Sequence, residues 1–289
     1  MTVILTLLII SILCSTARNI FSKGISDVKF GTRAFFALQT VIFGVGCLLL
    51  LVFAVPLERI SAQTALYSLL YGILLVGAQY LYTLALKSGK VGICSTVYSL
   101  GFILPTVSGS IFWNEPVNVY NVLGVVLVIP MIALCALGKN QTGTETAGKE
   151  YVVPLIFSML CSGGLGIMQK LQQKSTCFYQ KNEFLVTAFA LAAIVSLVTA
   201  LCVKAEKSEF SKPKAVKSGV VGAAFAVSNL CNTTLSGKLP TAVFFPLLNI
   251  GTIAASVLCG ILLYKEKCTK KDIAVLCLGA ASIILISRR

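Results

Sequence analysis

The sequence has no histidine, and charged residues make up only 12% of its 289 positions. A soluble protein of this length usually carries about 25% charged residues, so the shortage excludes an ordinary soluble enzyme and a disordered chain. Acidic residues are scarcest, at 10 against 24 basic ones. In a soluble protein this excess of positive charge would indicate nucleic acid. Here the basic residues lie mostly between apolar stretches, so we expect no nucleic-acid partner.

The missing histidines also limit the chemistry that the chain can perform. The 11 cysteines include no C-x-x-C pair, and most lie in apolar stretches, where cysteine behaves as a small apolar residue. Without histidine or clustered cysteine, a metal site is not expected. No Asp or Glu lies in the middle of an apolar stretch, so an intramembrane enzyme would lack its base or its metal ligands. We therefore expect no cofactor, no metal and no enzymatic activity.

Apolar sequence, by contrast, is abundant: 57% of the residues are hydrophobic, and the mean hydropathy is +0.91. A membrane-spanning helix needs about 20 mostly apolar residues. Stretches of this kind cover residues 2–22, 30–54, 62–86, 91–112, 119–138, 152–171, 183–203, 215–236, 241–263 and 272–287. We therefore predict an all-α membrane protein with ten transmembrane helices. It would be a multi-pass protein in the lipid bilayer of the cell membrane, which in a bacterium is the inner membrane. The first stretch is expected to stay in the mature protein, because no basic residue precedes Arg18 as it would in a signal peptide.

The two halves of the sequence resemble each other. Of the sixteen residues 8–23, eight recur at the same places in 155–170. The tripeptide Ser-Gly-Lys at 88–90 recurs at 236–238, and Glu115 is matched by Glu266. The period is about half of the chain, so we predict two five-helix repeats, residues 1–138 and 152–289. The linker loop 139–151 would join them within one integrated membrane domain. Because five is odd, the second repeat enters the membrane from the opposite side. Transporters with such inverted repeats bind their substrate near the midplane between the halves.

Each matched glutamate follows a span and precedes an apolar helix that contains glycine. The segment 113–116 (Trp-Asn-Glu-Pro) leads to Gly124, and 264–267 (Tyr-Lys-Glu-Lys) leads to Gly279. Together with the ten spans and the five-plus-five repeat, these motifs resemble the drug/metabolite transporter superfamily, in particular its EamA-like ten-helix members. The second glycine departs from the pattern, since it lies 13 residues from its glutamate against 9 in the first half. The resemblance implies a central cavity lined by helices one, three, four, six, eight and nine. Helices five and ten would lie at the periphery, and a homodimer would form through them.

The two glutamates also have a structural explanation. Each precedes the start of a predicted helix, where a carboxylate is attracted to the positive end of the helix dipole. We therefore predict that Glu115 and Glu266 each stabilise the helix that follows in the sequence.

Polar residues inside the spans are candidates for a substrate site, because polar groups are costly in hydrocarbon. The fifth and tenth spans are nearly bare of them, in agreement with a peripheral position. The substrate-binding candidates are Arg18, Asn19, Gln79, Tyr82, Tyr98, Asn229, Asn232 and Asn249. Of these, Asn229 and Asn232 are three residues apart and therefore share a helix face.

Arg18 allows two interpretations. It stands where the second repeat has Leu165, and the surrounding segment 163–166 contains three glycines. The planar donor fork of Arg18 could bind an anionic or carboxylate group of the substrate. Alternatively, its long side chain could snorkel to the membrane surface, since the end of its span at Ser22 is only about 6 Å further along the helix.

The first span also limits the substrate class. Small multidrug-resistance relatives in the same superfamily bind cations through a glutamate in their first helix, and this first span has no carboxylate. We therefore predict a secondary transporter for a small polar metabolite, an amino acid or similar, that is neutral, zwitterionic or anionic. The mechanism would be alternating access. The alternatives are a lipid-linked or nucleotide-sugar carrier, a cationic multidrug exporter and, from another class, a membrane scaffold without transport.

The orientation is predicted in two opposite ways. The loops after the odd-numbered spans carry most of the lysines and arginines, which places both termini outside the cytoplasm. The family resemblance implies that both termini are cytoplasmic. In either case the two termini lie on the same side, as an even number of spans requires.

Overall fold

The computed structural model describes residues 2–54, 59–113, 119–136, 147–204, 210–239, 241–266 and 269–287, and within these ranges its regular structure is entirely helical. The α-helices are α1 (Thr2–Lys23), α2 (Arg33–Ala54), α3 (Ala62–Ser88), α4 (Val91–Ser99), α5 (Ile103–Trp113), α6 (Val119–Ala136), α7 (Ala147–Lys174), α8 (Lys181–Cys202), α9 (Lys212–Lys238), α10 (Thr241–Tyr264) and α11 (Lys270–Ser287). Two short 3-10 helices, η1 (Leu100–Phe102) and η2 (Phe178–Gln180), precede α5 and α8.

Every predicted span coincides with helical structure to within a few residues. One boundary was wrong: α7 begins at Ala147, so residues 147–151 of the predicted linker loop are helical. The remainder of that loop, 139–146, lies outside the described residues.

The fourth predicted span is a broken helix and not a continuous one. It consists of α4, the 3-10 turn η1 and α5. The break has a local cause at Pro105, which has no N–H to donate and whose ring crowds the carbonyl group four residues earlier, that of Gly101. The chain therefore tightens into a 3-10 turn at Leu100–Phe102 before the α-helix resumes.

The helices identify a multi-pass membrane protein. Within the described ranges, seven helical segments are long and apolar enough to cross a bilayer: Val3–Lys23, Arg33–Phe53, Ala62–Ser88, Val91–Gly109, Tyr151–Lys174, Phe178–Cys202 and Leu247–Tyr264. A shorter apolar helix covers Asp272–Leu285. Helix α9 is not in this group, and it carries several buried polar side chains, such as Ser228, Asn229 and Thr233. Many large apolar side chains on the outside, for example Leu13, Leu48 and Leu258, are exposed, as expected of residues that face lipid.

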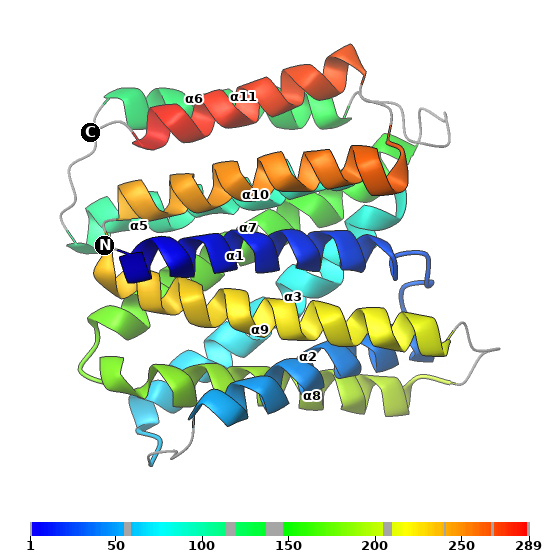
Figure 1. The fold of residues 1–289 in the computed structure, drawn as a ribbon, viewed down its shortest axis with the longest axis vertical. Coiled ribbons are helices and arrows are strands. Elements are labelled where there is room, and N and C mark those ends of the chain that lie inside the picture. Colours follow the sequence, from blue (N-terminus) through cyan, green and yellow to red (C-terminus); the bar gives the residue numbers. More distant parts are fainter. Residues whose placement is uncertain are drawn as a thin grey trace.

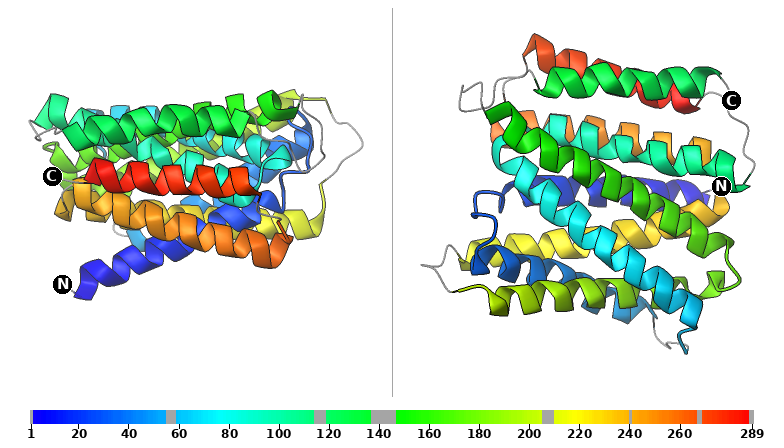
Figure 2. Two further views of the ribbon diagram at one scale, coloured as in Figure 1. Left: turned by 90° about the horizontal axis from the view of Figure 1, so that it is seen from above. Right: turned by 180° about the vertical axis from the view of Figure 1, so that it is seen from behind.

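The helices are stacked side by side in two layers. Figures 1 and 2 show α1, α9 and α10 on one face and α3, α5 and α7 on the opposite face. Helices α6 and α11 pack on each other at one edge of the molecule, and α2 and α8 pack on each other at the other edge (Figure 1). Both termini lie at the same end of the helices.

Two hydrophobic clusters hold this arrangement together. One includes the fully buried Phe43, Tyr71 and Phe189 of α2, α3 and α8. The other includes Leu100 and Phe244, from the turn η1 and from α10. Tyr98 packs against both clusters, so it marks the region where they meet.

Candidate substrate-binding site

A polar cavity of about 90 Å³ lies between the two layers. Its walls come from α1, α4, η1, α5, α7, α9 and α10. Among the predicted site residues, those that line the cavity are Arg18, Asn19, Tyr98, Asn229, Asn232 and Asn249. Residues from both halves of the chain therefore meet around one space. Ser15, Ser162, Gln169 and Thr252 also line the cavity, although no sequence pattern distinguishes them from the other polar residues of their helices.

The other two predicted residues, Gln79 and Tyr82, lie behind this wall. Both are fully buried on α3, and neither is among the described residues that line the cavity. The resemblance implied that the third helix would line the cavity, and within the described part of the chain this expectation is wrong. Gln79 and Tyr82 instead contact Arg18, which does line it.

Arg18 is buried, with only 4% of its surface exposed. Its Nε donates a hydrogen bond of 3.0 Å to Oε1 of Gln79. The guanidinium carbon lies 4.3 Å from the ring centre of Phe225, 4.5 Å from that of Tyr98 and 5.1 Å from that of Tyr82. A cation over such rings is attracted by their electron-rich faces. Arg18 therefore does not snorkel to the membrane surface, and its side chain lies in the wall of the cavity.

The charge of Arg18 is only partly compensated. Its Nη2 is buried and has no hydrogen-bond partner among the described residues. Among the described residues that line the cavity, none is an Asp or a Glu. A buried guanidinium without a carboxylate is unusual, because removing a charge from water is costly unless that charge is paired.

The side chain of Asn229 is used inside the protein. Its Oδ1 accepts hydrogen bonds from the hydroxyl of Tyr71 and, over 3.1 Å, from Nε2 of Gln169. Its Nδ2 donates to the carbonyl oxygen of Phe225 over 2.7 Å. Gln169 also donates to the Tyr71 hydroxyl at 2.9 Å. This closed network joins α3, α7 and α9 and gives Asn229 a role in building the cavity wall.

The side-chain amides of the other asparagines differ in how many hydrogen bonds they make. Asn19 donates to the hydroxyls of Ser95 at 3.0 Å and Ser256 at 3.2 Å, which ties α1 to α4 and α10. The Oδ1 of Asn232 accepts a hydrogen bond from Ser11. The side chain of Asn249 lines the cavity and makes no hydrogen bond to the described part of the chain.

Close helix packing fixes one side of the cavity. A side-chain carbon at Gly163 on α7 would collide with the backbone oxygen of Gly101 in η1, and one at Gly101 would collide with the backbone of α7. Gly163 therefore permits the close backbone approach that glycine favours, and Gly164 and Gly166 leave room for the side chains of Leu74 and Pro105.

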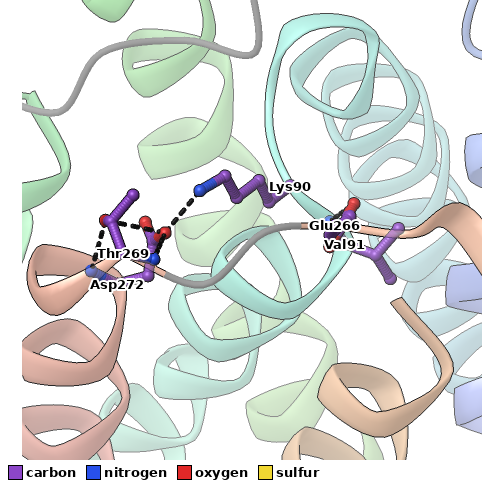
Figure 3. Close-up of polar contacts among 5 residues, drawn as sticks. All are labelled: Lys90, Val91, Glu266, Thr269 and Asp272. Carbon is purple, nitrogen blue, oxygen red and sulfur yellow. Dashed lines mark hydrogen bonds and ion pairs between the residues drawn. The ribbon is translucent and has the colours of Figure 1, made fainter. Parts of the chain in front are cut away.

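Beyond one end of the cavity, a polar cluster joins the ends of several helices (Figure 3). Oε1 of Glu266 accepts a 2.8 Å hydrogen bond from the backbone N–H of Val91, the first residue of α4. Nearby, Lys90 forms an ion pair with Asp272, whose Oδ2 also accepts from the N–H of Thr269 at 2.8 Å. Lys23, at the end of α1, donates to the carbonyl oxygens of Leu86 and Gly89 at 2.6 and 2.8 Å.

The prediction for Glu266 was therefore wrong about the helix that it stabilises. The carboxylate accepts from the N-terminus of α4 and not from α11, the next helix in the chain. The reason is a tight turn after α10, in which Lys265 has a positive φ of 51° and the N–H of Glu266 donates to the carbonyl oxygen of Gly260. This turn directs Glu266 back toward α4. Glu115 lies outside the described residues.

No three His, Cys, Asp or Glu side chains in the described ranges lie close enough together to hold a metal ion. The cavity instead offers hydrogen-bonding groups and one cation, which suit reversible binding of a small polar molecule.

Comparison with known proteins identifies the class. Residues 2–137 match the model of the EamA-like transporter family, which is a family of transporters and not of enzymes. The apolar helices make the chain a multi-pass membrane protein, and the match makes residues 2–137 similar to transporters of the drug/metabolite type. The resemblance seen in the sequence is thus confirmed for residues 2–137, which are similar to the EamA-like transporter family.

A solved structure, described only as the crystal structure of a protein, has the same fold. It matches with a TM-score of 0.67 and 14% sequence identity, covering 100% of this chain and 99% of that chain. At this identity the likeness concerns the fold alone. No curated protein matches the sequence.

Proposed function

We propose that the protein is a secondary transporter that moves a small polar metabolite, of amino-acid size, through the central cavity by alternating access. The observation that carries this proposal is the cavity itself, with polar residues from both halves of the chain and one unpaired cation in its wall. A transporter of this type binds its substrate between two similar halves.

The size of the cavity supports a small substrate. One water-sized particle needs about 10–15 Å³ of such space. A cavity of about 90 Å³ therefore admits roughly six to nine non-hydrogen atoms. Nucleotide sugars and lipid-linked sugars are several times larger, so the cavity favours the metabolite over these alternatives.

The helix contacts support two inverted five-helix repeats. In such an arrangement α1, α2, α3, α4–α5 and α6 would correspond to α7, α8, α9, α10 and α11. Whenever two helices are in contact, the two helices that correspond to them should then be in contact as well. The contact of α3 with α7 has its counterpart in that of α9 with α1, and the contact of α2 with α9 in that of α8 with α3. The contact of α1 with α10 likewise has its counterpart in that of α7 with α4 and α5. Pairs that should map onto themselves, such as α2 with α8 and α6 with α11, are in contact as well.

Such symmetry gives alternating access a simple physical form. If the two halves exchange conformations, the contacts that close one end should form at the other end. Here Glu266 accepts from the start of α4 and Lys90 pairs with Asp272, so these contacts link helix ends on one side. At the corresponding positions of the other repeat the sequence has Glu115, Lys238 and Asn121. The Lys90–Asp272 ion pair therefore has no equivalent in the other repeat, where Asn121 replaces the aspartate. We expect the conformation described here to be more stable than the one in which the two halves have exchanged conformations. The 3-10 turn η1 provides a site where α4 and α5 can pivot, as such breaks often do.

Transport into liposomes tests the proposal. The purified protein would be reconstituted into proteoliposomes and assayed for uptake of a radiolabelled mixture of small amino, hydroxy and keto acids. Wild-type protein should accumulate label above empty liposomes, and Asn249→Phe, which fills the cavity, should reduce uptake to background.

Leu258→Phe is the matched control, because it places the same ring on the exposed side of the same helix, α10. It should transport as the wild type does. Equal uptake by Asn249→Phe and wild type would show that solutes do not pass through this cavity. Uptake of the mixture at background in the wild type and in both variants would contradict a transport function.

A further inference from the structure

We infer that the cavity recognises small carboxylate anions, and that Arg18 binds their carboxylate group. This inference rests on the proposed function, since it names the substrate class of the same cavity. It follows from three features of the described residues: the charge in the cavity, the way the guanidinium is held, and the polar side chains in the cavity wall that make no hydrogen bond within the described part of the chain.

The charge balance of the cavity requires an anion. Arg18 is the single charged side chain among the described residues that line the cavity. It is 4% exposed, and its Nη2 has no hydrogen-bond partner in the described ranges. The surrounding rings compensate a buried cation only in part. A ligand with one negative charge would pair with Arg18, whereas an organic cation would be repelled. A doubly charged phosphate would bring more charge than one arginine can neutralise.

The guanidinium is held ready for such a ligand. Gln79 fixes Nε at 3.0 Å, and Gln79 is itself fixed, because its Nε2 donates to Ser22 at 3.3 Å and to Thr83 at 3.2 Å. The rings of Tyr98 and Phe225 confine the group further. Nη2 is left without an acceptor among the described residues, and a carboxylate in the plane of the fork would supply one.

The rest of the ligand would be recognised by neutral groups. Asn249, Ser15 and Ser99 line the cavity, and none of their side chains forms a hydrogen bond within the described part of the chain. They can bind a hydroxyl, carbonyl or amide group. No described lining residue carries the negative charge that an ammonium group would need. The structure therefore favours hydroxy, keto and aromatic monocarboxylates over cationic amines.

Pairs of ligands that differ only in charge test this inference. The purified protein would be titrated in detergent with lactate and lactamide, propionate and propionamide, and nicotinate and nicotinamide. Both thermal stability and binding heat would be measured, and inorganic phosphate and tetraethylammonium would be included. At least one carboxylate should raise the melting temperature, and its amide should not.

The variants locate the effect. Arg18→Gln should weaken carboxylate binding by about 10- to 100-fold, the usual range for losing charge-assisted hydrogen bonds. Arg18→Lys, which keeps the charge and loses the fork, should retain part of the affinity. Lys214→Gln removes a cation that pairs with the exposed Asp27 and should bind as the wild type does. If Arg18→Gln fails to fold, the comparison of carboxylate with amide on the wild-type protein still decides.

Equal stabilisation by a carboxylate and its amide would overturn the inference, as would binding of phosphate or tetraethylammonium alone. No stabilisation by any of the carboxylates would overturn it as well. Two outcomes separate it from the proposed function. Uptake that Asn249→Phe abolishes, without any preference for carboxylates, would contradict the inference and leave transport standing. Carboxylate binding that depends on Arg18, without uptake of any solute, would contradict transport and leave the binding site standing.

Discussion

Nε of Arg18 donates a 3.0 Å hydrogen bond to Oε1 of Gln79, a residue 61 positions away on another helix. This contact turns the arginine of α1 away from the membrane surface and toward the centre of the bundle. It also uses one of the donor groups of Arg18, while Nη2 has no hydrogen-bond partner in the part of the chain that the structure describes. The consequences of this contact for stability and binding can be measured.

Replacing Gln79 by leucine should disorder the guanidinium. The variant loses the acceptor for Arg18 and leaves the buried Nε–H unpaired, which costs about 1–3 kcal/mol. We expect a lower melting temperature and weaker carboxylate binding, because the fork is no longer held in place. Gln63→Leu is the control on the same helix, since Gln63 pairs with Tyr67 and Thr176 and has no contact with Arg18. A Gln79→Leu protein that melts and binds like Gln63→Leu would show that the contact does not position Arg18.

Replacing Gly163 by alanine should separate α7 from η1. The added methyl group would meet the backbone oxygen of Gly101 and the side chain of Leu104, and such overpacking typically costs about 1–3 kcal/mol. Thermal unfolding in detergent measures the effect. Gly44→Ala is the matched control, because a side-chain carbon at Gly44 has no neighbour within 4 Å. Since alanine favours helices by about 1 kcal/mol over glycine, the control should melt at or above the wild-type temperature. A Gly163→Ala protein that does the same would contradict the close packing.

Replacing Glu266 by alanine should loosen the polar cluster shown in Figure 3. The N–H of Val91 loses its acceptor, and losing a helix cap of this kind costs about 1 kcal/mol. Glu266→Gln keeps an acceptor oxygen and should lose less. Melting temperatures would rank the variants.

Asp27→Asn provides a comparison for Glu266, because it breaks an ion pair with Lys214 in which the Asp27 side chain is 67% exposed. Exposed pairs contribute at most about 1 kcal/mol to the free energy of unfolding, and many contribute nothing measurable. If Glu266→Ala is no more harmful than Asp27→Asn, the carboxylate does not stabilise the start of α4.

The helices could be predicted from the sequence because each depends on a local run of apolar residues. The position of Arg18 could not, since the sequence allowed both a buried side chain and one that reaches the membrane surface. The difference depends on Gln79, Tyr98 and Phe225, which come from three other helices. For the same reason the sequence did not show that Asn229 is bound by Gln169 and Tyr71, nor that Glu266 stabilises α4.

The most direct test of the account is counterflow of a carboxylate. Proteoliposomes would be loaded with the unlabelled carboxylate that stabilises the protein most and diluted into a trace of the same compound carrying a radiolabel. A transporter with this cavity as its site predicts a transient accumulation of label in the wild type, strongly reduced by Arg18→Gln and unchanged by Lys214→Gln. Accumulation of the same height in wild type and Arg18→Gln, or none in either protein, would contradict it.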